Sequence, residues 1–414
     1  MPVFGFNLNS RLDAPPNGHL TIIANARIPG EKAHVIQLMQ MASAFSRHFT
    51  RVRLVYPRRA NTKSMTSVTD PFAYYDLPRC FGLVALPCID AVKRVTMDWP
   101  FFNRLPFPLI AHLLQLWTFT LAAFLFVARL PGGVVYSRDL FVLTLLALLS
   151  RRRDRIFVFE VHTLPRSRPA RRLHLWAAKR ADAIVAISDH LYDWYLDRGL
   201  DTDRLIVARD GVNLEMFADL PDRVTARSRL GISNEVRVVT YTGHFYPWKG
   251  ADILAAAALS LPAPWQIHLV GGIREDFHRL EALSDGKRLC VCGHLPQREA
   301  FLYIAAADVV VLPNSGESDI SASYTSPLKL FEYLASGRPL IASDLPSIRE
   351  VVKSNKHALL VPPDSPKELA AAILHLGANP ELARKLAESA QEYAAMFAWP
   401  VRARTIVQFL GLLR

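Results

Sequence analysis

Short apolar runs that alternate with helical segments, in two successive series, are the feature that most constrains the fold. Each run has the length of a buried strand, and each is followed by a loop and then by a segment with helical spacing of apolar residues. Such alternation is typical of doubly wound parallel sheets. The first series contains His19 to Ala26, Arg51 to Pro57, Gly133 to Tyr136, Ile156 to Val161 and Ala183 to Ile187. The second contains Val236 to Gly243, Trp265 to Gly272, Arg288 to Leu295, Ala307 to Pro313 and Pro339 to Ser343.

A polar, charged segment at residues 219 to 229 separates the two series. We therefore predict an α/β fold of two Rossmann-like domains, an N-terminal domain of residues 1–218 and a C-terminal domain of residues 219–395. The chain of 414 residues is long enough to give each domain a full core. The last helical pattern is interrupted at Pro400, and we expect residues 396–414 to pack back onto the first domain.

Charge and composition limit the function classes. A hydrophobic content of 51% with 21% charged residues excludes a disordered chain, and four cysteines do not form a disulfide framework at this length. The net charge of +12 indicates an acidic partner or surface. Arginines gather at 151–155 and 166–172 without the interleaved aromatic residues of a base-stacking surface, which favours a membrane surface over nucleic acid. The N-terminal residues lack the apolar region of a secretory signal, so we expect a cytoplasmic protein.

Residues 109–128 carry no charged side chain, and a helix of about 20 apolar residues can span a bilayer. A single crossing would place the strand candidates before and after it on opposite sides of the membrane, although both look like members of one sheet. We therefore expect a helix that is partly buried in the N-terminal domain and partly inserted into the membrane interface, with peripheral attachment. A wholly buried core helix is the alternative.

The segment from Ser326 to Val351 predicts a loop, a helix, a buried strand and a second helix start. Ser326 suits the N-cap and Pro327 the first helical position, and Gly337 follows the expected last residue, Ser336. The amides of Leu328 and Lys329 would lie in the first turn, where unpaired N–H groups favour an anion such as phosphate. Glu332 would lie on the same face one turn further, within reach of a ribose. A plain amphipathic helix with an exposed glutamate explains the same pattern.

Loops at the carboxyl ends of parallel strands form the binding crevice of a doubly wound sheet. In the first domain these loops carry Arg138, Asp139, Glu160 and His162, although an ion pair or a solvated histidine would explain them too. The first strand-to-helix loop contains only Gly30, and the absence of a G-x-G-x-x-G motif argues against a dinucleotide cofactor.

The second domain offers Lys249 at a helix start, directly before Gly250, where a lysine can neutralise a diphosphate. Gly271 and Gly272 end a strand in the same crevice, where they would admit a nucleotide or form a tight turn. Cys290, Cys292 and His294 alternate at strand spacing and so share one face, but no fourth ligand lies nearby in the sequence. We predict that they bind no zinc.

Together these segments resemble a glycosyltransferase of family 4 with the GT-B fold. The resemblance rests on ARIPGEKAH, FEVHTLP, AIVAISDHL, DGVNLEMF and YTGHFYPWKG, and above all on SPLKLFEYLASGRPLIASDLPSIREV. It covers nearly the whole chain and is more specific in the second half. It implies two Rossmann-like domains facing across a cleft and transfer of a sugar from a nucleoside-diphosphate donor, with retention of configuration and without a metal or other cofactor.

The resemblance also implies roles for individual residues. The diphosphate would be held by Lys249 and by the amides of Leu328 and Lys329, the ribose by Glu332, and His162 would face the reacting sugar. Further donor-binding and contact candidates complete the set: Gly243, His244, Gly272, Ser326 and Pro327 for the donor, and Lys32, His34, Arg138, Glu317 and Tyr324 for the sugar or acceptor.

Two departures from the family pattern affect the donor site. Family members usually carry an arginine directly after the first glycine of the second domain, where this chain has His244. They also often have a glutamate eight residues before the ribose-binding one, where this chain has Tyr324. Glu317 or Asp319 would be the nearest substitutes for that carboxylate.

The prediction is a glycosyltransferase on the inner membrane surface that uses a nucleotide sugar and a lipid-linked or polysaccharide acceptor, and that binds no nucleic acid. Two alternatives remain open. The first is a sugar-nucleotide epimerase, which would use the same fold, and the second is a non-catalytic homologue that binds only the sugar nucleotide or the membrane.

Overall fold

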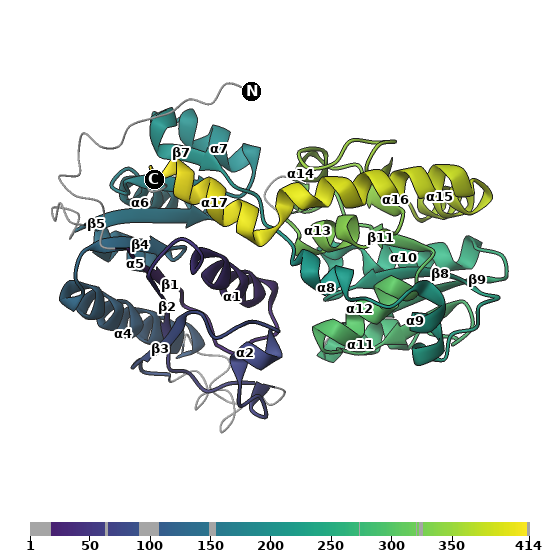
Figure 1. The fold of residues 1–414 in the computed structure, drawn as a ribbon, viewed down its shortest axis with the longest axis horizontal. Coiled ribbons are helices and arrows are strands. Elements are labelled where there is room, and N and C mark those ends of the chain that lie inside the picture. Colours follow the sequence, from purple (N-terminus) through teal and green to yellow (C-terminus); the bar gives the residue numbers. More distant parts are fainter. Residues whose placement is uncertain are drawn as a thin grey trace. The chain divides into compact units, whose positions relative to one another are not determined.

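The computed structural model describes residues 18–62, 65–90, 107–148, 155–272, 274–319, 321–322 and 326–411. The chain divides into two compact units (Figure 1). Unit 1 comprises Met1–Ala208 and Trp399–Arg414, and unit 2 comprises Arg209–Ala398. The sequence placed the boundary at residue 218, but Met216, in the short helix α8, belongs to a core cluster of unit 2. The expected return of the C-terminus is present, because the last helix lies in unit 1.

Unit 1 is a seven-stranded parallel sheet in the order β3-β2-β1-β4-β5-β6-β7. Its strands are β1 (His19–Ile23), β2 (Arg51–Pro57), β3 (Gly82–Leu86), β4 (Gly133–Ser137), β5 (Arg155–Val161), β6 (Ala183–Ala186) and β7 (Leu205–Val207). Its helices are α1 (Ala33–Phe45), α2 (Pro71–Tyr74), α4 (Phe107–Arg129), α5 (Leu140–Ala147), α6 (Arg168–Ala178), α7 (Asp189–Leu196) and α17 (Trp399–Phe409). Helix α17 packs against α1, and Pro400 lies in the first turn of α17.

Unit 2 is a six-stranded parallel sheet in the order β10-β9-β8-β11-β12-β13. Its strands are β8 (Arg237–Thr242), β9 (Trp265–Val270), β10 (Leu289–Cys292), β11 (Val309–Leu312), β12 (Leu340–Ser343) and β13 (Leu359–Val361). Its helices are α8 (Leu214–Ala218), α9 (Arg223–Leu230), α10 (Ala251–Ala257), α11 (Arg274–Glu281), α12 (Gln297–Ala306), α13 (Leu328–Ala335), α14 (Pro346–Arg349), α15 (Pro366–Ala378) and α16 (Pro380–Ala394).

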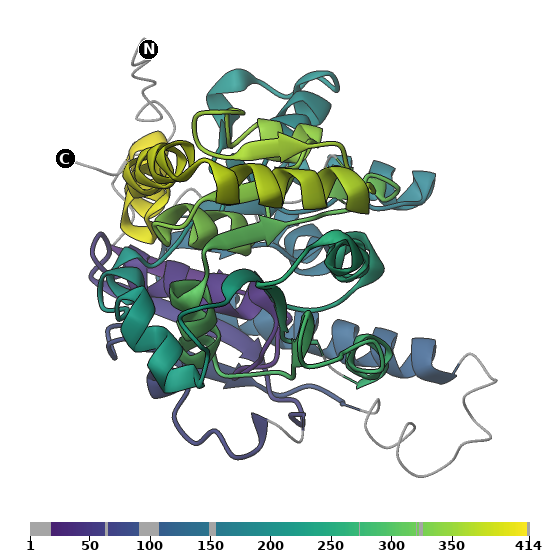
Figure 2. The same ribbon diagram turned by 90° about the vertical axis from the view of Figure 1, so that its right-hand side faces the viewer.

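Helices cover both faces of the unit 2 sheet (Figure 2). Alternate residues of β11 enter two different cores: Val309 and Val311 pack in the cluster that includes α10 and α15, whereas Val310 and Leu312 pack in the one that includes α12, α13 and α16. This two-sided burial is the reason that the central strands are continuous apolar runs. The two parallel, doubly wound sheets confirm the predicted fold class.

Helix α4 is the one helix in the described parts of the chain that is long and apolar enough to cross a membrane. One side of it is buried on the sheet of unit 1, through Phe119, Ala123 and Val127. Its other side exposes large apolar residues, among them Leu113, Trp117 and Leu121. The alternative of a wholly buried core helix is therefore wrong, and the expectation of partial burial is confirmed.

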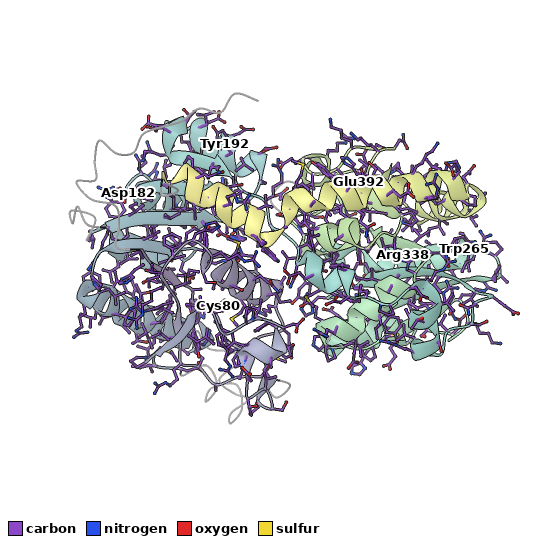
Figure 3. All side chains as sticks on the ribbon, in the orientation of Figure 1. Cys80, Asp182, Tyr192, Trp265, Arg338 and Glu392 are labelled. Carbon is purple, nitrogen blue, oxygen red and sulfur yellow. The ribbon has the colours of Figure 1, made fainter. Side chains whose placement is uncertain are left out.

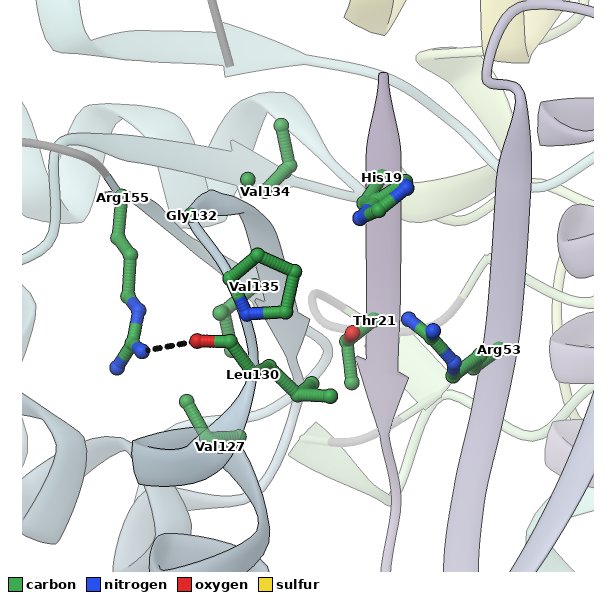
Figure 4. Close-up of a pocket in the computed structure, with 11 residues that line it drawn as sticks. His19, Thr21, Arg53, Val127, Leu130, Gly132, Val134, Val135 and Arg155 are labelled. Carbon is green, nitrogen blue, oxygen red and sulfur yellow. Dashed lines mark hydrogen bonds between the residues drawn. The ribbon is translucent and has the colours of Figure 1, made fainter. Parts of the chain in front are cut away.

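Arg155 corrects part of the sequence interpretation. It was counted in an arginine cluster facing a membrane, but it is only 4% exposed and its Nη2 donates to the Leu130 carbonyl at 2.7 Å (Figure 4). This hydrogen bond ties the first residue of β5 to the loop after α4, at the amino end of the sheet. The rest of that cluster, residues 151–153, lies outside the described residues.

Candidate functional site

The carboxyl ends of β8 and β9 meet in two glycine turns of unit 2. Gly243 has a φ of 122° and Gly272 a φ of 72°, and the Gly272 amide donates to the Gly243 carbonyl at 3.2 Å. A Cβ on Gly272 would lie 2.2 Å from the Phe245 ring, so a larger residue would displace that ring. Close packing against Phe245 and the positive φ values thus account for these glycines.

Helix α13 begins at Leu328, not at Pro327 as expected, and ends at Ala335. Its N-cap is Pro327, and no side chain caps it. The prediction that Ser326 caps the helix is wrong: the Ser326 hydroxyl accepts from the Asp210 amide at 3.1 Å instead. Gly337 has a φ of 65° just past the C-cap Ser336, as predicted. The Ser326 hydroxyl therefore accepts no hydrogen bond from the first-turn amides of α13.

The side chain of Lys329 is the feature of this site that the sequence did not predict. Its ammonium lies over the Tyr241 ring, 3.8 Å from the ring centre, and a Cβ on Gly243 would be 3.0 Å from Nζ. Lys329 is 9% exposed, and Nζ has no hydrogen-bond partner among the described residues. Burial and the neighbouring Lys249 hold the pKa of Lys329 well below its ordinary value. A buried ammonium of this kind is stabilised by an anion.

Lys249 and Glu332 lie within electrostatic range of this ammonium. Lys249 ends the short 3-10 helix Pro247–Lys249, and burial lowers its pKa to about 8, although Glu332 opposes that shift. Burial raises the pKa of Glu332 to about 7, against the effect of Lys329, Gln297 and Lys249. Gln297 donates to Glu332 at 3.3 Å. The structure thus brings together the three predicted residues Lys249, Lys329 and Glu332, and no described ion pair within 4.0 Å joins them.

Other polar groups complete the edge of unit 2. Asn314 follows β11, is 1% exposed, and neither polar atom of its side chain has a hydrogen-bond partner among the described residues. The next residue, Ser315, donates its amide to the Trp248 carbonyl at 3.0 Å, which joins this loop to the Lys249 segment. His244 is partly buried and stacks on Tyr246 at 5.3 Å. Asn314 was not predicted, because a single asparagine after a strand carries no periodic signal.

Of the two sugar contacts predicted in this loop, Glu317 lies in the part of the chain that the structure describes. Glu317 has an exposed side chain, and its amide donates to the Ser315 hydroxyl. Tyr324 lies outside the described residues. Of the two glutamates in the family pattern, this chain therefore has the second, Glu332.

A second polar cluster lies at the carboxyl ends of β4 and β5 in unit 1. His162 hydrogen-bonds to Glu160, which also accepts from Tyr136 and, at 2.6 Å, from Gln37. Arg402 of α17 lies 3.4 Å from the same carboxylate. Although burial opposes ionisation, Arg402 and His162 hold the pKa of Glu160 well below its ordinary value. Glu160 is thus a buried carboxylate that fixes the orientation of His162.

The remaining predicted residues of unit 1 adjoin this cluster. Arg138 donates to Gln37 at 2.8 Å, whereas Asp139 accepts from the Asn25 amide, so the two neighbours have different partners. Burial, followed by the charges of Arg138, Lys32 and His162, lowers the pKa of His34 to about 4. A cavity of about 230 Å³ opens beside Arg138, Glu160 and His162. Sequence reasoning missed Gln37 and Arg402, because they come from helices distant in the sequence.

The opposite edge of the unit 2 sheet holds a larger cavity of about 850 Å³, lined among others by Trp265 and Arg338 (Figure 3). It lies at the amino ends of the strands, and its arginines are largely bonded within the unit, for example Arg227 to Asp308 at 2.7 Å. Cys290 and Cys292 are free thiols, and Cys292 Sγ donates to the Tyr303 hydroxyl at 3.4 Å.

Comparison with known proteins identifies the class that this geometry defines. Residues 34–216 match the family described as Glycosyltransferase Family 4, and residues 236–379 match Glycosyl transferases group 1. The crystal structure of Anabaena HepE in complex with UDP and glucose superposes with a TM-score of 0.70 at 17% identity, over 95% of this chain and 99% of that one. Sucrose-phosphate synthase from Thermosynechococcus elongatus gives 0.69 at 21% identity, over 95% and 98%. These two likenesses establish the GT-B fold.

Curated relatives are similar to about half of the chain. The D-inositol 3-phosphate glycosyltransferase of Corynebacterium glutamicum is 32% identical over 49% of this chain and 50% of its own length. That of Geodermatophilus obscurus is 30% identical over 54% and 49%. The chain thus spans about half the length of the curated relatives it matches. With one family model on each half, the chain belongs to the family 4 type of GT-B glycosyltransferases.

Proposed function

We propose that this chain transfers a sugar from a nucleoside-diphosphate donor, bound by unit 2, to a hydroxyl group of a lipid-linked or polysaccharide acceptor. The observation that carries the proposal is the pair of lysines, the partly buried Lys249 and the buried Lys329, beside Glu332 at the strand ends. Two ammonium groups whose charged forms are disfavoured by burial match a dianionic ligand, because the ligand restores the charge balance. A diphosphate on a nucleoside supplies both that charge and the ribose for Glu332.

Lys329 also explains how the donor site could lack the arginine that family members usually carry at the position of His244. The expected arginine would have placed a permanent charge directly after Gly243. The Lys329 ammonium occupies the space against Gly243 from the side of α13. We infer that this ammonium replaces the missing arginine, and that the amides of Leu328 and Lys329 add hydrogen bonds from the helix start.

The proposed reaction retains the configuration of the donor sugar and uses no metal or cofactor. The bond between the sugar C1 and the diphosphate oxygen breaks, and the acceptor oxygen forms its bond to C1 on the same face. The acceptor proton passes to the leaving diphosphate, whose developing charge Lys249 and Lys329 stabilise. On the family resemblance, His162 contacts the reacting sugar, held in its orientation by Glu160.

Lys249→Met and Lys329→Met test the donor site. Each removes one ammonium, and we expect UDP to bind roughly 10 to 100 times more weakly by calorimetry, since a charged hydrogen bond contributes about 1.5–3 kcal/mol. Lys367→Met, at an exposed lysine of α15, is the matched control. Wild-type affinity in both variants would refute the site, and a thermal-shift screen of other nucleoside diphosphates would identify the base.

Product analysis distinguishes the proposed glycosyltransferase from the two alternatives, an epimerase and a non-catalytic homologue. The chain is incubated with UDP-sugars and with acceptors from a lipid extract. We expect it to release UDP and to form a glycosylated acceptor. Nucleotide binding without turnover would favour a non-catalytic homologue, and an isomerised sugar nucleotide would favour an epimerase.

A further inference from the structure

The layer of helices α4, α5 and α6 on unit 1 exposes an unusual combination of side chains. These helices pack side by side, α4 on α5 and α5 on α6. Large apolar side chains of α4 are exposed along nearly its whole length. They are Leu109 at 60%, Ile110 at 53%, Leu113 at 37%, Leu114 at 41%, Trp117 at 58%, Leu121 at 55% and Leu125 at 43%. Isolated exposed apolar residues are ordinary on soluble proteins, but a continuous apolar stripe marks an interaction surface.

The same helical layer carries positive charge without exposed negative charge. Arginine and lysine side chains are exposed in and beside α4 and α6, namely Arg129, Arg166, Arg168, Arg171, Arg172, Lys179 and Arg180. Within residues 107–148 and 155–181, where the structure describes the chain, Asp139 and Glu160 are the acidic residues, and neither is exposed. Asp139 accepts from the Asn25 amide and Glu160 is buried.

We propose that this face, the α4 stripe with the α6 arginines, binds the surface of an anionic lipid bilayer. An apolar stripe flanked by arginines matches the two parts of a bilayer interface, because acyl chains accept the leucines and tryptophan while anionic head groups pair with the guanidinium groups. A protein partner would be expected to meet at least some exposed carboxylates on such a face with its own basic residues, and within residues 107–148 and 155–181 no carboxylate is exposed.

The packing of α4 also sets its orientation. Buried residues extend from Ala111 to Val127, so the helix is attached to unit 1 over its whole length. In the folded unit it therefore lies in the plane of the interface and does not cross the bilayer. Trp117, near the middle of the stripe and in contact with Phe141, is the expected anchor, because indole rings favour the head-group region.

This inference deepens the proposed function and rests on it only for the choice of a lipid-linked acceptor. Bilayer binding needs neither the donor site nor turnover. Failure of one is therefore distinguishable from failure of the other, since UDP binding and vesicle binding are measured separately.

Sedimentation of the full chain with vesicles provides the test, with phosphatidylcholine alone compared with phosphatidylcholine containing phosphatidylglycerol. We expect binding to the anionic vesicles that weakens with salt. Trp117→Glu with Leu121→Glu is expected to abolish it. Arg168→Gln with Arg172→Gln is expected to weaken partitioning roughly 25-fold, at about fivefold for each arginine near an anionic surface.

Leu259→Glu is the matched control, because Leu259 is 79% exposed and belongs to unit 2, whereas the proposed face belongs to unit 1. The control and both pairs of variants should keep the UDP affinity and the unfolding temperature of the wild type. Equal binding to neutral and anionic vesicles, or unchanged binding in both pairs of variants, would overturn the inference. The inference would also be overturned if the wild-type chain does not bind vesicles but forms a dimer that Trp117→Glu with Leu121→Glu dissociates. In that case the face binds a second copy of the chain.

Discussion

Glu332 shows how one carboxyl group is set by opposing influences. Burial favours its neutral form, whereas Lys329, Gln297 and Lys249 favour the charged form. Burial dominates, and the pKa of Glu332 rises to about 7. A diphosphate at the lysines would be repelled by an ionised Glu332 unless the ribose hydroxyls donate to that carboxylate. In the proposed donor site, Glu332 would therefore favour a nucleotide over a simple phosphate.

A consequence for stability follows from the raised pKa of Glu332. Between pH 4.5 and about 7 the folded chain keeps a proton that the unfolded chain releases, so the free energy of unfolding should fall as pH rises through this interval. Glu332→Gln removes this titration, and we expect the variant to lose that part of the pH dependence. Urea unfolding at several pH values measures it. The exposed Glu392→Gln is the control, and an identical pH slope in wild type and Glu332→Gln would contradict the assignment.

Among the elements, α17 links the end of the chain to the cluster around His162. Arg402 lies 3.4 Å from Glu160 and donates to the Ala208 carbonyl at 3.0 Å. It thus joins α17 to β5 and to the residue that follows β7. Both side chains are almost fully buried, so each needs the other's charge.

A double-mutant cycle tests this link. Glu160→Gln leaves the Arg402 charge buried without its carboxylate, and we expect unit 1 to lose about 3–5 kcal/mol of unfolding free energy. Glu160→Gln with Arg402→Met removes both charges and should recover much of that loss. Denaturant unfolding of the two single variants and the double variant gives the coupling energy. Additive losses would show that the two residues act independently.

The elements also show what the sequence could predict. The strand series, the long apolar helix and the Gly337 end of α13 were predictable because each depends on local periodicity or on glycine conformation. The start of α13 was not, since the Ser326 hydroxyl is used by Asp210, 116 residues away in the sequence. The strands β3 and β13 were missed because their segments lack a clear pattern. The sequence likewise predicted that the amide of Lys329 lies in the first turn of α13, but not that its ammonium lies between Tyr241 and Gly243.

On the scale of the whole molecule, the proposed donor should protect one unit and not the other. UDP at 100 times its dissociation constant stabilises the state that binds it by about 2.7 kcal/mol. Hydrogen exchange followed by mass spectrometry is expected to slow in peptides from residues 209–398, above all in β8, α13 and the Lys249 segment. Peptides of β1, β2 and α4 should change little. Protection centred on unit 1 would move the nucleotide site to that unit.

The assignment of Trp399–Arg414 to unit 1 has a consequence for synthesis on the ribosome. Unit 2 is a continuous segment, so all of its strands are synthesised before α17. Unit 1 begins first but lacks α17, with its buried Ala403, Ile406 and Val407, until residues 399–409 emerge. The face of α1 that α17 covers stays open during most of translation. A chain truncated before Trp399 would therefore keep all of unit 2 but leave that face of α1 uncovered, and we expect its unit 1 to be cleaved faster by proteases.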